Sequence, residues 1–336
     1  MRGVLAALAV AFVGCADLDE PSVAACASCH TVTAQRFARS AHAGAAESEL
    51  FRALRAREGA QRQAFCDRCH APSAHPSGGL SCATCHHATG NRETANGRLT
   101  WDFSRAPMGR SGEAPHGLRD PGFLRDAQLC GSCHEVEGGP GFDEPAFSEF
   151  VRSPAARAGL GCADCHADRD HGFVGREHPE AAARFAQSAS VRVQFLDAET
   201  LEVTLTNESQ AHTLPSGFRL AREVSVVVDL YDAAGRLRET LRDDAPGDDA
   251  MTLGERVEDA RGARVLPAEG VRVRRAVLDP GASRRWRRRV TDPAVMRADA
   301  RVEHLRQNAW LRAALGLAPL TEAPLVLAVH SAARPP

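Results

Sequence analysis

Ten of the eleven cysteines in this 336-residue chain lie in five copies of one short pattern, Cys-x-x-Cys-His. The copies begin at Cys26, Cys66, Cys82, Cys130 and Cys162. Two thiols at this spacing can form thioether bonds to the vinyl groups of one haem, and the histidine that follows can bind its iron. The sequence therefore predicts a c-type cytochrome with five covalently bound haem c groups.

The expected ligands follow directly from the pattern. The predicted thioether cysteines are Cys26, Cys29, Cys66, Cys69, Cys82, Cys85, Cys130, Cys133, Cys162 and Cys165. The predicted proximal iron ligands are His30, His70, His86, His134 and His166.

Zinc is the alternative cofactor, because Cys-x-x-Cys pairs also bind this metal. Zinc binding does not require a histidine directly after each second cysteine, whereas all five copies have one here. We therefore favour haem. Because haem attachment consumes these ten thiols, we expect no structural disulfide.

The five motifs must be positioned by very little polypeptide. They all lie between residues 26 and 166, and roughly 30 residues per haem are too few to build an ordinary hydrophobic core. The haems must then form the core. Composition predicts helices over 34–57 and over 144–158, the second interrupted at Pro154, with loops at 71–80 and 105–122.

The pattern changes after residue 190, where apolar and polar residues begin to alternate as in β-strands. The expected strands are 191–195, 201–205, 224–230, 271–278, 286–290, 301–305 and 325–329. So many short strands favour a β-sandwich, with immunoglobulin-like topology as the specific expectation. The predicted fold class is α+β: a mostly helical and loop pentahaem domain at 16–185, then a β-sandwich domain at 186–332.

The N-terminus has the features of an export signal. Met1 and Arg2 precede a short apolar run, and Val13-Gly14-Cys15 resembles the lipobox of bacterial lipoproteins, which would make Cys15 the lipidated N-terminus. An ordinary signal peptide cut nearby is the alternative. In both cases we expect an exported protein, periplasmic or at the outer membrane or cell surface, whose only membrane contact is a lipid anchor.

The haem segment resembles a known family, the cytochrome c-554 type of multihaem cytochrome, which is related to the haem arrays of hydroxylamine oxidoreductase and pentahaem nitrite reductase. The resemblance rests on the sequences around the motifs: Phe-Ala-Arg-Ser-Ala-His at 37–42, Cys-His-Ala-Pro at 69–72, Gly-Leu-Ser at 79–81 before the third motif, and His-Gly-Phe-Val-Gly at 171–175. A further match lies in the β region, where Thr206-Asn207 is followed by His-Thr-Leu-Pro-Ser-Gly at 212–217. The resemblance implies electron transfer.

The second axial ligands are expected among the nine histidines outside the motifs, since 14 occur in total. The resemblance implies His42, His171 and His212, and the position of His116 before the fourth motif makes it a candidate. For the remaining haem we consider His75 and His87, with His178 behind them. His87 follows His86 directly, so it could serve only a different haem. One haem could also be five-coordinate, and Met108 is expected to pack in the interior.

Two absences limit the chemistry. The chain has no lysine, since all 41 basic residues are arginine, and Tyr231 is its only tyrosine. The lysine-ligated catalytic haem of nitrite-reducing pentahaem enzymes is thus excluded, and a haem-linked tyrosine is not expected. We favour an electron carrier that is not an enzyme and has no identified catalytic residue. The alternatives are a redox enzyme acting on a nitrogen or sulfur oxide at an open haem, and a structural subunit of an electron conduit.

The arginine-rich segment 284–289 is the remaining unusual feature. Its alternation indicates a strand with a solvated face. The other interpretations are docking to an acidic partner and pairing with haem propionates. We expect redox proteins as partners and no binding to nucleic acid.

Overall fold

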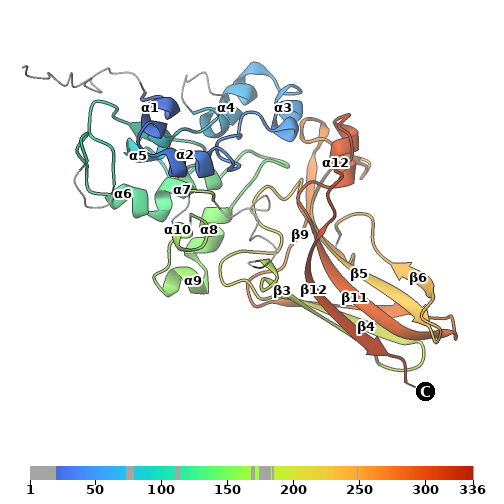
Figure 1. Cartoon of the computed structure of the whole chain (residues 1–336). Coiled ribbons are helices and arrows are strands. Elements are labelled where there is room, and N and C mark those ends of the chain that lie inside the picture. The colour runs from blue at the N-terminus through green and yellow to red at the C-terminus, as the bar shows by residue number, and fades with distance from the viewer. Residues whose placement is uncertain are drawn as a thin grey trace, which may run out of the picture.

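The computed structural model shows a helical part followed by a sheet part (Figure 1). It describes residues 20–72, 79–109, 114–167, 171–173, 183, 185–247 and 249–335. The predicted lipidation site Cys15 and the candidate ligands His75 and His178 lie outside these residues.

The helical part consists of short helices joined by turns. These helices are α1 (Val23–Ala27), α2 (Thr31–Phe37), α3 (Glu49–Arg55), α4 (Ala60–His70), α5 (Cys82–His86), α6 (Gly122–Arg125), α7 (Ala127–His134), α8 (Ala146–Val151), α9 (Pro154–Arg157) and α10 (Cys162–Cys165). One small hairpin, β1 (Ala88–Asn91) with β2 (Leu99–Trp101), lies between α5 and α6. Among its described residues, the buried apolar ones include Phe37, Leu50, Leu54, Met108 and Phe150.

The sheet part contains two antiparallel sheets. Its strands are β3 (Ala189–Phe195), β4 (Thr200–Asn207), β5 (Glu223–Asp232), β6 (Leu237–Leu241), β7 (Thr252–Glu258), β8 (Arg264–Val265), β9 (Arg272–Ala276), β10 (Ser283–Arg289), β11 (Val295–Leu305) and β12 (Leu325–Ala333). One sheet has the order β10-β4-β3, and the other follows β12-β11-β5-β7-β8, with β6 added on β5 and β9 on β7.

The two sheets bury one apolar cluster between them. Val191 and Val193 of β3 point inward while Ser190 and Arg192 point outward, which is the alternation that a half-buried strand requires. The inward residues of β3 and β4 pack with those of β5 and β11 in a single core that also includes Trp286. The α+β class is therefore confirmed, and the sheet region is a two-sheet structure.

A second apolar cluster joins the helical part to the sheet part. Leu50 and Leu54 of α3 pack against Leu311 and Leu315 of α12 (Ala309–Ala314) and its end, together with Leu220. Figure 1 shows α12 beside α3 at the junction of the two parts. Arg312 of α12 also pairs with Glu49 of α3 at 2.9 Å. Segments far apart in sequence thus form one packed unit here.

The predicted strands all occur, whereas one predicted helix is wrong in extent. The segment 34–57 forms α2 and α3 separated by turns, because Ser48 caps a new helix by accepting a hydrogen bond from Phe51 N. The break at Pro154 occurs as predicted, with Ser153 capping α9. The strands β6, β7 and β8 and the hairpin β1–β2 were not predicted.

No helix within the described ranges is long and apolar enough to cross a membrane.

Candidate haem-binding sites

Each Cys-x-x-Cys-His motif lies on a helix or at its end. The motifs occupy the end of α1 and the turn after it, the last turns of α4 and α7, the whole of α5, and α10 with the residue that follows. On a helix, residues separated by three or four positions share one face. Both sulfurs and the imidazole of a motif therefore lie on one side of the helix, where a single haem can contact all three.

Local sequence explains why these short helices form. Ser81 begins α5 with a capping box, in which its hydroxyl accepts from Thr84 N and its own N donates to Thr84 Oγ1. Asp126 caps α7 by accepting from Gln128 N at 2.9 Å. Before α10, Gly161 N donates to Asp164 Oδ2 at 2.7 Å. Caps therefore support helices that are too short to be stable alone.

Four of the five motif histidines face a second histidine from elsewhere in the chain. The separations between ring centres are 6.2 Å for His30 and His116, 6.0 Å for His134 and His42, 6.1 Å for His86 and His171, and 6.3 Å for His166 and His212. Two imidazoles that bind opposite sides of one metal ion have ring centres about 6 Å apart, because each metal–nitrogen bond is about 2 Å long. All four pairs fit an iron between them.

The second members of these pairs come from four different places. His42 lies between α2 and α3, shortly after the first motif, yet it faces the histidine of the fourth. His116 follows β2, and His171 follows α10 with a left-handed backbone at φ 57°. His212 lies in the loop after β4 and reaches the fifth motif from the sheet part. The pairing thus links segments across the whole chain.

The electrostatic environment keeps two of the second histidines, His42 and His212, neutral. Burial, together with the nearby His134 and His166, lowers the pKa of His42 to about 4. Burial and the proximity of His166 likewise lower the pKa of His212 to about 4. Neutral imidazole is the form that binds a metal ion. These rings are therefore in the ligand form at neutral pH.

The Nδ1 atoms of three motif histidines have identified hydrogen-bond partners. His70 Nδ1 lies 2.9 Å from the carbonyl oxygen of Ala45, and His86 Nδ1 lies 2.7 Å from that of Met108. His134 Nδ1 instead lies 2.8 Å from the carboxylate of Glu144. A donor hydrogen on Nδ1 leaves Nε2 available for iron.

His70 differs from the other motif histidines. Phe51 stacks on its ring with centres 3.9 Å apart, and no histidine ring in the described part of the chain faces it as in the four pairs. His87 is buried with its Nδ1 3.4 Å from the Asp102 carbonyl oxygen and its ring beside Phe103. The structure therefore does not bring the candidate His87 to His70.

Cysteine side chains of different motifs lie beside each other in three places among the described residues. The neighbouring thiols are Cys26 and Cys82, Cys69 and Cys133, and Cys130 and Cys162. The first motif is thus adjacent to the third, the second to the fourth, and the fourth to the fifth. Groups attached to these cysteines would lie close together.

The fold has a solved counterpart. No protein-family model and no curated protein sequence matches the chain. Among solved structures it is similar to a penta-heme cytochrome c552 from Thermochromatium tepidum, with a TM-score of 0.73 and 18% sequence identity. The match covers 94% of this chain and 99% of that one. This chain has the fold of a penta-heme cytochrome.

The zinc alternative finds no support in the geometry of this cytochrome fold. Within the residues that the structure describes, no three or more His, Cys, Asp or Glu side chains converge as a metal site would require. The contacts between motifs bring together single cysteines from each, so no four-thiolate group forms. The four facing histidine pairs are the positive observation, and they fit haem.

A buried polar cluster beside His212 was not identified from the sequence. Glu149 of α8 accepts hydrogen bonds from Thr213 N at 3.2 Å, from Thr213 Oγ1 at 2.9 Å and from Ser216 Oγ at 2.9 Å, and it pairs with Arg219. Its Oε2 is 3.8 Å from His212 Nδ1. The side chains of Glu149 and Arg219 are 5% and 3% exposed. The cluster holds the His212 loop against the helical part.

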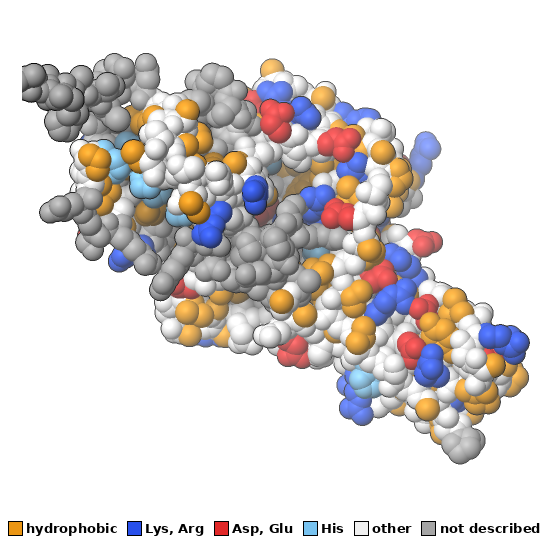
Figure 2. Space-filling model, in the orientation of Figure 1, with side chains coloured by type: hydrophobic (Ala, Val, Ile, Leu, Met, Phe, Trp, Pro, Cys, Tyr) orange, Lys and Arg blue, Asp and Glu red, His pale blue; other side chains and the backbone are white. Residues whose placement is uncertain are grey.

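Met108 and the arginines of β10, which we also considered from the sequence, have roles in packing and in ion pairs. Met108 is buried with Ala88 and Leu129, as expected for a packing residue. The arginines of β10 pair largely with acidic residues of the sheet part: Arg287 with Glu202 at 3.2 Å and Arg289 with Glu199 at 2.8 Å. This fits the solvated-strand interpretation. Figure 2 shows charged side chains over the sheet part, with histidines grouped on the helical part.

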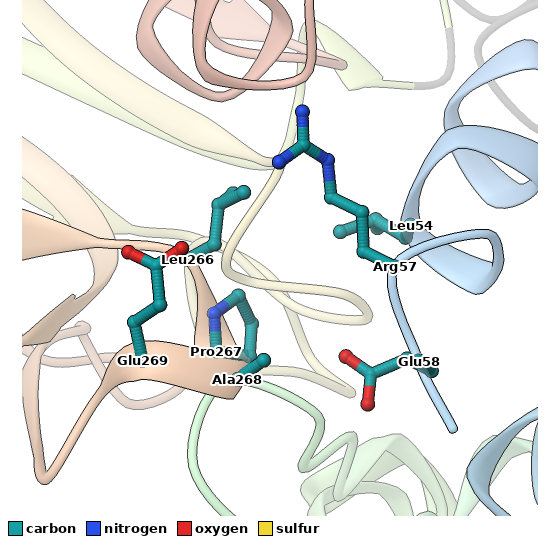
Figure 3. A pocket seen from close by; sticks show the side chains of 7 residues that line it. All are labelled: Leu54, Arg57, Glu58, Leu266, Pro267, Ala268 and Glu269. Atoms are coloured by element: carbon teal, nitrogen blue, oxygen red, sulfur yellow. The ribbon is translucent and has the colours of Figure 1, made fainter.

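A cavity of about 240 Å³ lies between α3 and the segment 266–269. Figure 3 shows Leu54, Arg57 and Glu58 on its helical side, opposite residues 266–269 of the sheet part. No motif residue lines it. It is a gap in the contact between the two parts.

Proposed function

We propose that this chain is a pentahaem c-type cytochrome that transfers electrons between redox partner proteins. The observation that carries the proposal is the set of four imidazole pairs with ring centres 6.0 to 6.3 Å apart. Two imidazoles leave no open position on an iron, so such sites are suited to electron transfer and not to substrate binding. Haem bound in this way supplies reversible one-electron chemistry.

The pairs suggest a ligand assignment. His116 is the second ligand of the haem held by His30, and His171 that of the haem held by His86. His42 serves the haem of His134, and His212 that of His166. Each assignment is supported by the distance between the ring centres. In each pair, the second histidine also comes from a segment outside the motif that it faces.

The cysteine contacts place the haems in two groups of neighbours. Thioether sulfurs of the first and third haems would be adjacent, and the fourth haem would have the second and the fifth beside it. Cys29 of the first motif and Cys165 of the fifth are exposed, whereas the cysteines of the other three motifs are at least partly buried. We infer that the first and fifth haems are the exchange points with partners.

The sheet domain has a supporting role in this proposal. It supplies His212, and the Glu149 cluster fixes the loop that carries it. Two packed sheets are compatible with the immunoglobulin-like topology expected from the sequence, which we retain as a proposal.

We also retain export and lipidation at Cys15. Cys15→Ser should then move the protein from the membrane fraction to the soluble fraction without changing its haem content.

A second candidate function is redox catalysis at the haem of His70. It is favoured by the absence of a facing histidine among the described residues, with Phe51 stacked against His70 instead. An iron with an open side can bind a small nitrogen or sulfur oxide. A subunit of a larger electron conduit is the third possibility, with the sheet domain as the contact.

The spin state of each haem tests the proposal. We expect intact mass to show five covalent haems, and EPR to show at least four low-spin centres with paired imidazoles. Turnover of nitrite and hydroxylamine should be slow. Fewer than four low-spin centres would refute the ligand assignment, and rapid turnover at a high-spin haem would favour the enzyme.

A further inference from the structure

Glu144 is in direct contact with a haem ligand, although nothing in the motif itself requires an acidic residue there. Its Oε1 lies 2.8 Å from His134 Nδ1, and its side chain is 19% exposed. It precedes α8 and is ten residues from His134 in sequence. The contact is formed by the fold of the loop between them.

The backbone of that loop places Glu144 beside His134. Val136 N donates to Glu144 O and Glu144 N donates to Val136 O, both at 2.9 Å, so the two residues form a bridge across the loop. Gly139 and Gly141 at its tip have φ values of 83° and 76°, a left-handed conformation that favours glycine. The Glu144 carboxylate is therefore held in place by the backbone.

The contact differs in kind from the others found at the motif histidines. His70 and His86 donate to backbone carbonyl oxygens, which are neutral. A carboxylate acceptor draws the Nδ1 proton more strongly and makes the imidazole a better electron donor to its metal. Its negative charge also favours the oxidised state, which carries one more positive charge. Both effects lower a reduction potential.

We propose that Glu144 is a positioning residue that lowers the potential of the haem held by His134 and His42. This inference rests on the proposed function, since it assumes haem at the fourth motif. That haem would lie at the branch between the second and fifth haems. A low potential there would make reduction of the fourth haem less favourable than reduction of its neighbours. Glu144 would set the size of this difference.

The test is a redox titration of the complete five-haem protein carrying Glu144→Gln. Glutamine keeps the size and an acceptor oxygen but removes the charge. One of the five midpoint potentials should rise by about 59 mV, which corresponds to a tenfold change in the equilibrium constant of a one-electron reduction. Haem content and low-spin EPR intensity should stay unchanged.

The matched control is Glu135→Gln. Glu135 directly follows His134, but its carboxylate accepts from Ser148 N and Oγ, both at 2.8 Å, and contacts no histidine in these bonds. The Glu135→Gln variant therefore also removes one negative charge close to His134. If both variants shift the same potential equally, the effect is general electrostatics and the proposal is overturned. Unchanged potentials in Glu144→Gln overturn it too.

A second variant covers the case in which glutamine impairs folding. Glu144→Asp keeps the charge but withdraws the carboxylate from His134 Nδ1, so the affected potential should rise above that of the wild type, and an unchanged potential would contradict the proposal. The affected haem must also be the one that becomes high-spin in His42→Ala. If instead the wild-type protein lacks five haems or low-spin signals, the proposed function fails, and this result is distinct from a missing potential shift.

Discussion

At the scale of single residues, the site depends on histidines that are far from their partners in sequence. The Nδ1 atom of His42 is buried with no hydrogen-bond partner in the described structure, and the ring faces His134. A buried nitrogen without a partner is costly. A bond from this nitrogen to iron would give it the partner that the protein does not supply.

We therefore expect His42→Ala to convert one haem to a high-spin, ligand-accessible state while all five haems remain attached. The fourth motif keeps its cysteines and His134, so only the second ligand is lost. EPR and carbon monoxide binding measure the change. His330→Ala is the control, because His330 lies on β12 and its Nδ1 accepts from Val193 N at 3.2 Å. A low-spin spectrum in His42→Ala would disprove this ligand assignment.

The sequence identifies some of these residues and not others for a physical reason. The motif cysteines and histidines can be predicted because one haem must contact all three within five consecutive residues. His42, His116, His171 and His212 can be proposed as ligands, but which motif each faces depends on the fold. Glu144 and Glu149 carry no sequence signal, because acidic residues are common and these contacts form only in the folded chain.

At the scale of elements, alternation predicts the strands that form the shared core. The β3 residues alternate between buried and exposed, so the pattern is visible in sequence. β6 is mostly exposed on both faces, with Leu237 56% exposed, so it lacks such a pattern. The segment 34–57 has the composition of one helix but must bend so that His42 reaches another motif. Tertiary contacts decide where its helices end.

The contact between α8 and the His212 loop should be a major source of stability. Glu149→Ala removes the acceptor for Thr213, Ser216 and Arg219 and leaves the Arg219 charge buried without its partner. Breaking a buried pair in this way costs about 3 to 5 kcal/mol in the free energy of unfolding. Denaturant unfolding measures it.

The control for that experiment is an exposed ion pair of the sheet part. Arg289 is 74% exposed and lies 2.8 Å from Glu199, which is 58% exposed. Surface pairs contribute about 0 to 1 kcal/mol, so Arg289→Ala should have little effect. A loss in Glu149→Ala no larger than in this control would mean that the cluster is not a clamp.

The stability of the sheet part should also depend on pH through Glu223 at the start of β5. Burial raises the pKa of Glu223 above its ordinary value of 4.5, although Arg264 lies 3.1 Å away and opposes the rise. As pH rises from 4.5 through the raised pKa, the unfolded chain has already lost this proton while the folded protein retains it. The folded state binds more protons, so its stability falls across this window.

Glu223→Gln should flatten that decline, because glutamine has no proton to lose. The measurement is the free energy of unfolding of both proteins at several pH values from 4.5 upward. Haem absorbance monitors the ligands in parallel, so that a change at the histidines is not mistaken for one at Glu223. Parallel curves for the two proteins would contradict the expectation.

At the scale of the whole molecule, two independent links make the helical and sheet parts one unit. One is the reach of His212 to the fifth motif, and the other is the apolar cluster of Leu50 and Leu54 with Leu311 and Leu315. The links lie at different places along the boundary, as the positions of α12 and α8 in Figure 1 indicate. A boundary fixed at two places resists rotation of one part on the other.

We therefore expect the wild-type protein to unfold in a single transition, and Leu311→Ala to weaken that cooperativity. Leu311 is fully buried in the joining cluster, so truncation should lower stability by about 2 to 5 kcal/mol. Haem absorbance reports the helical part and circular dichroism reports the strands; their midpoints should coincide in the wild type and separate in the variant. Leu237→Ala, at a 56% exposed position on β6, should leave them coincident. If the two midpoints already differ in the wild type, the two parts fold independently. His212 would then bind its haem only after both parts have folded.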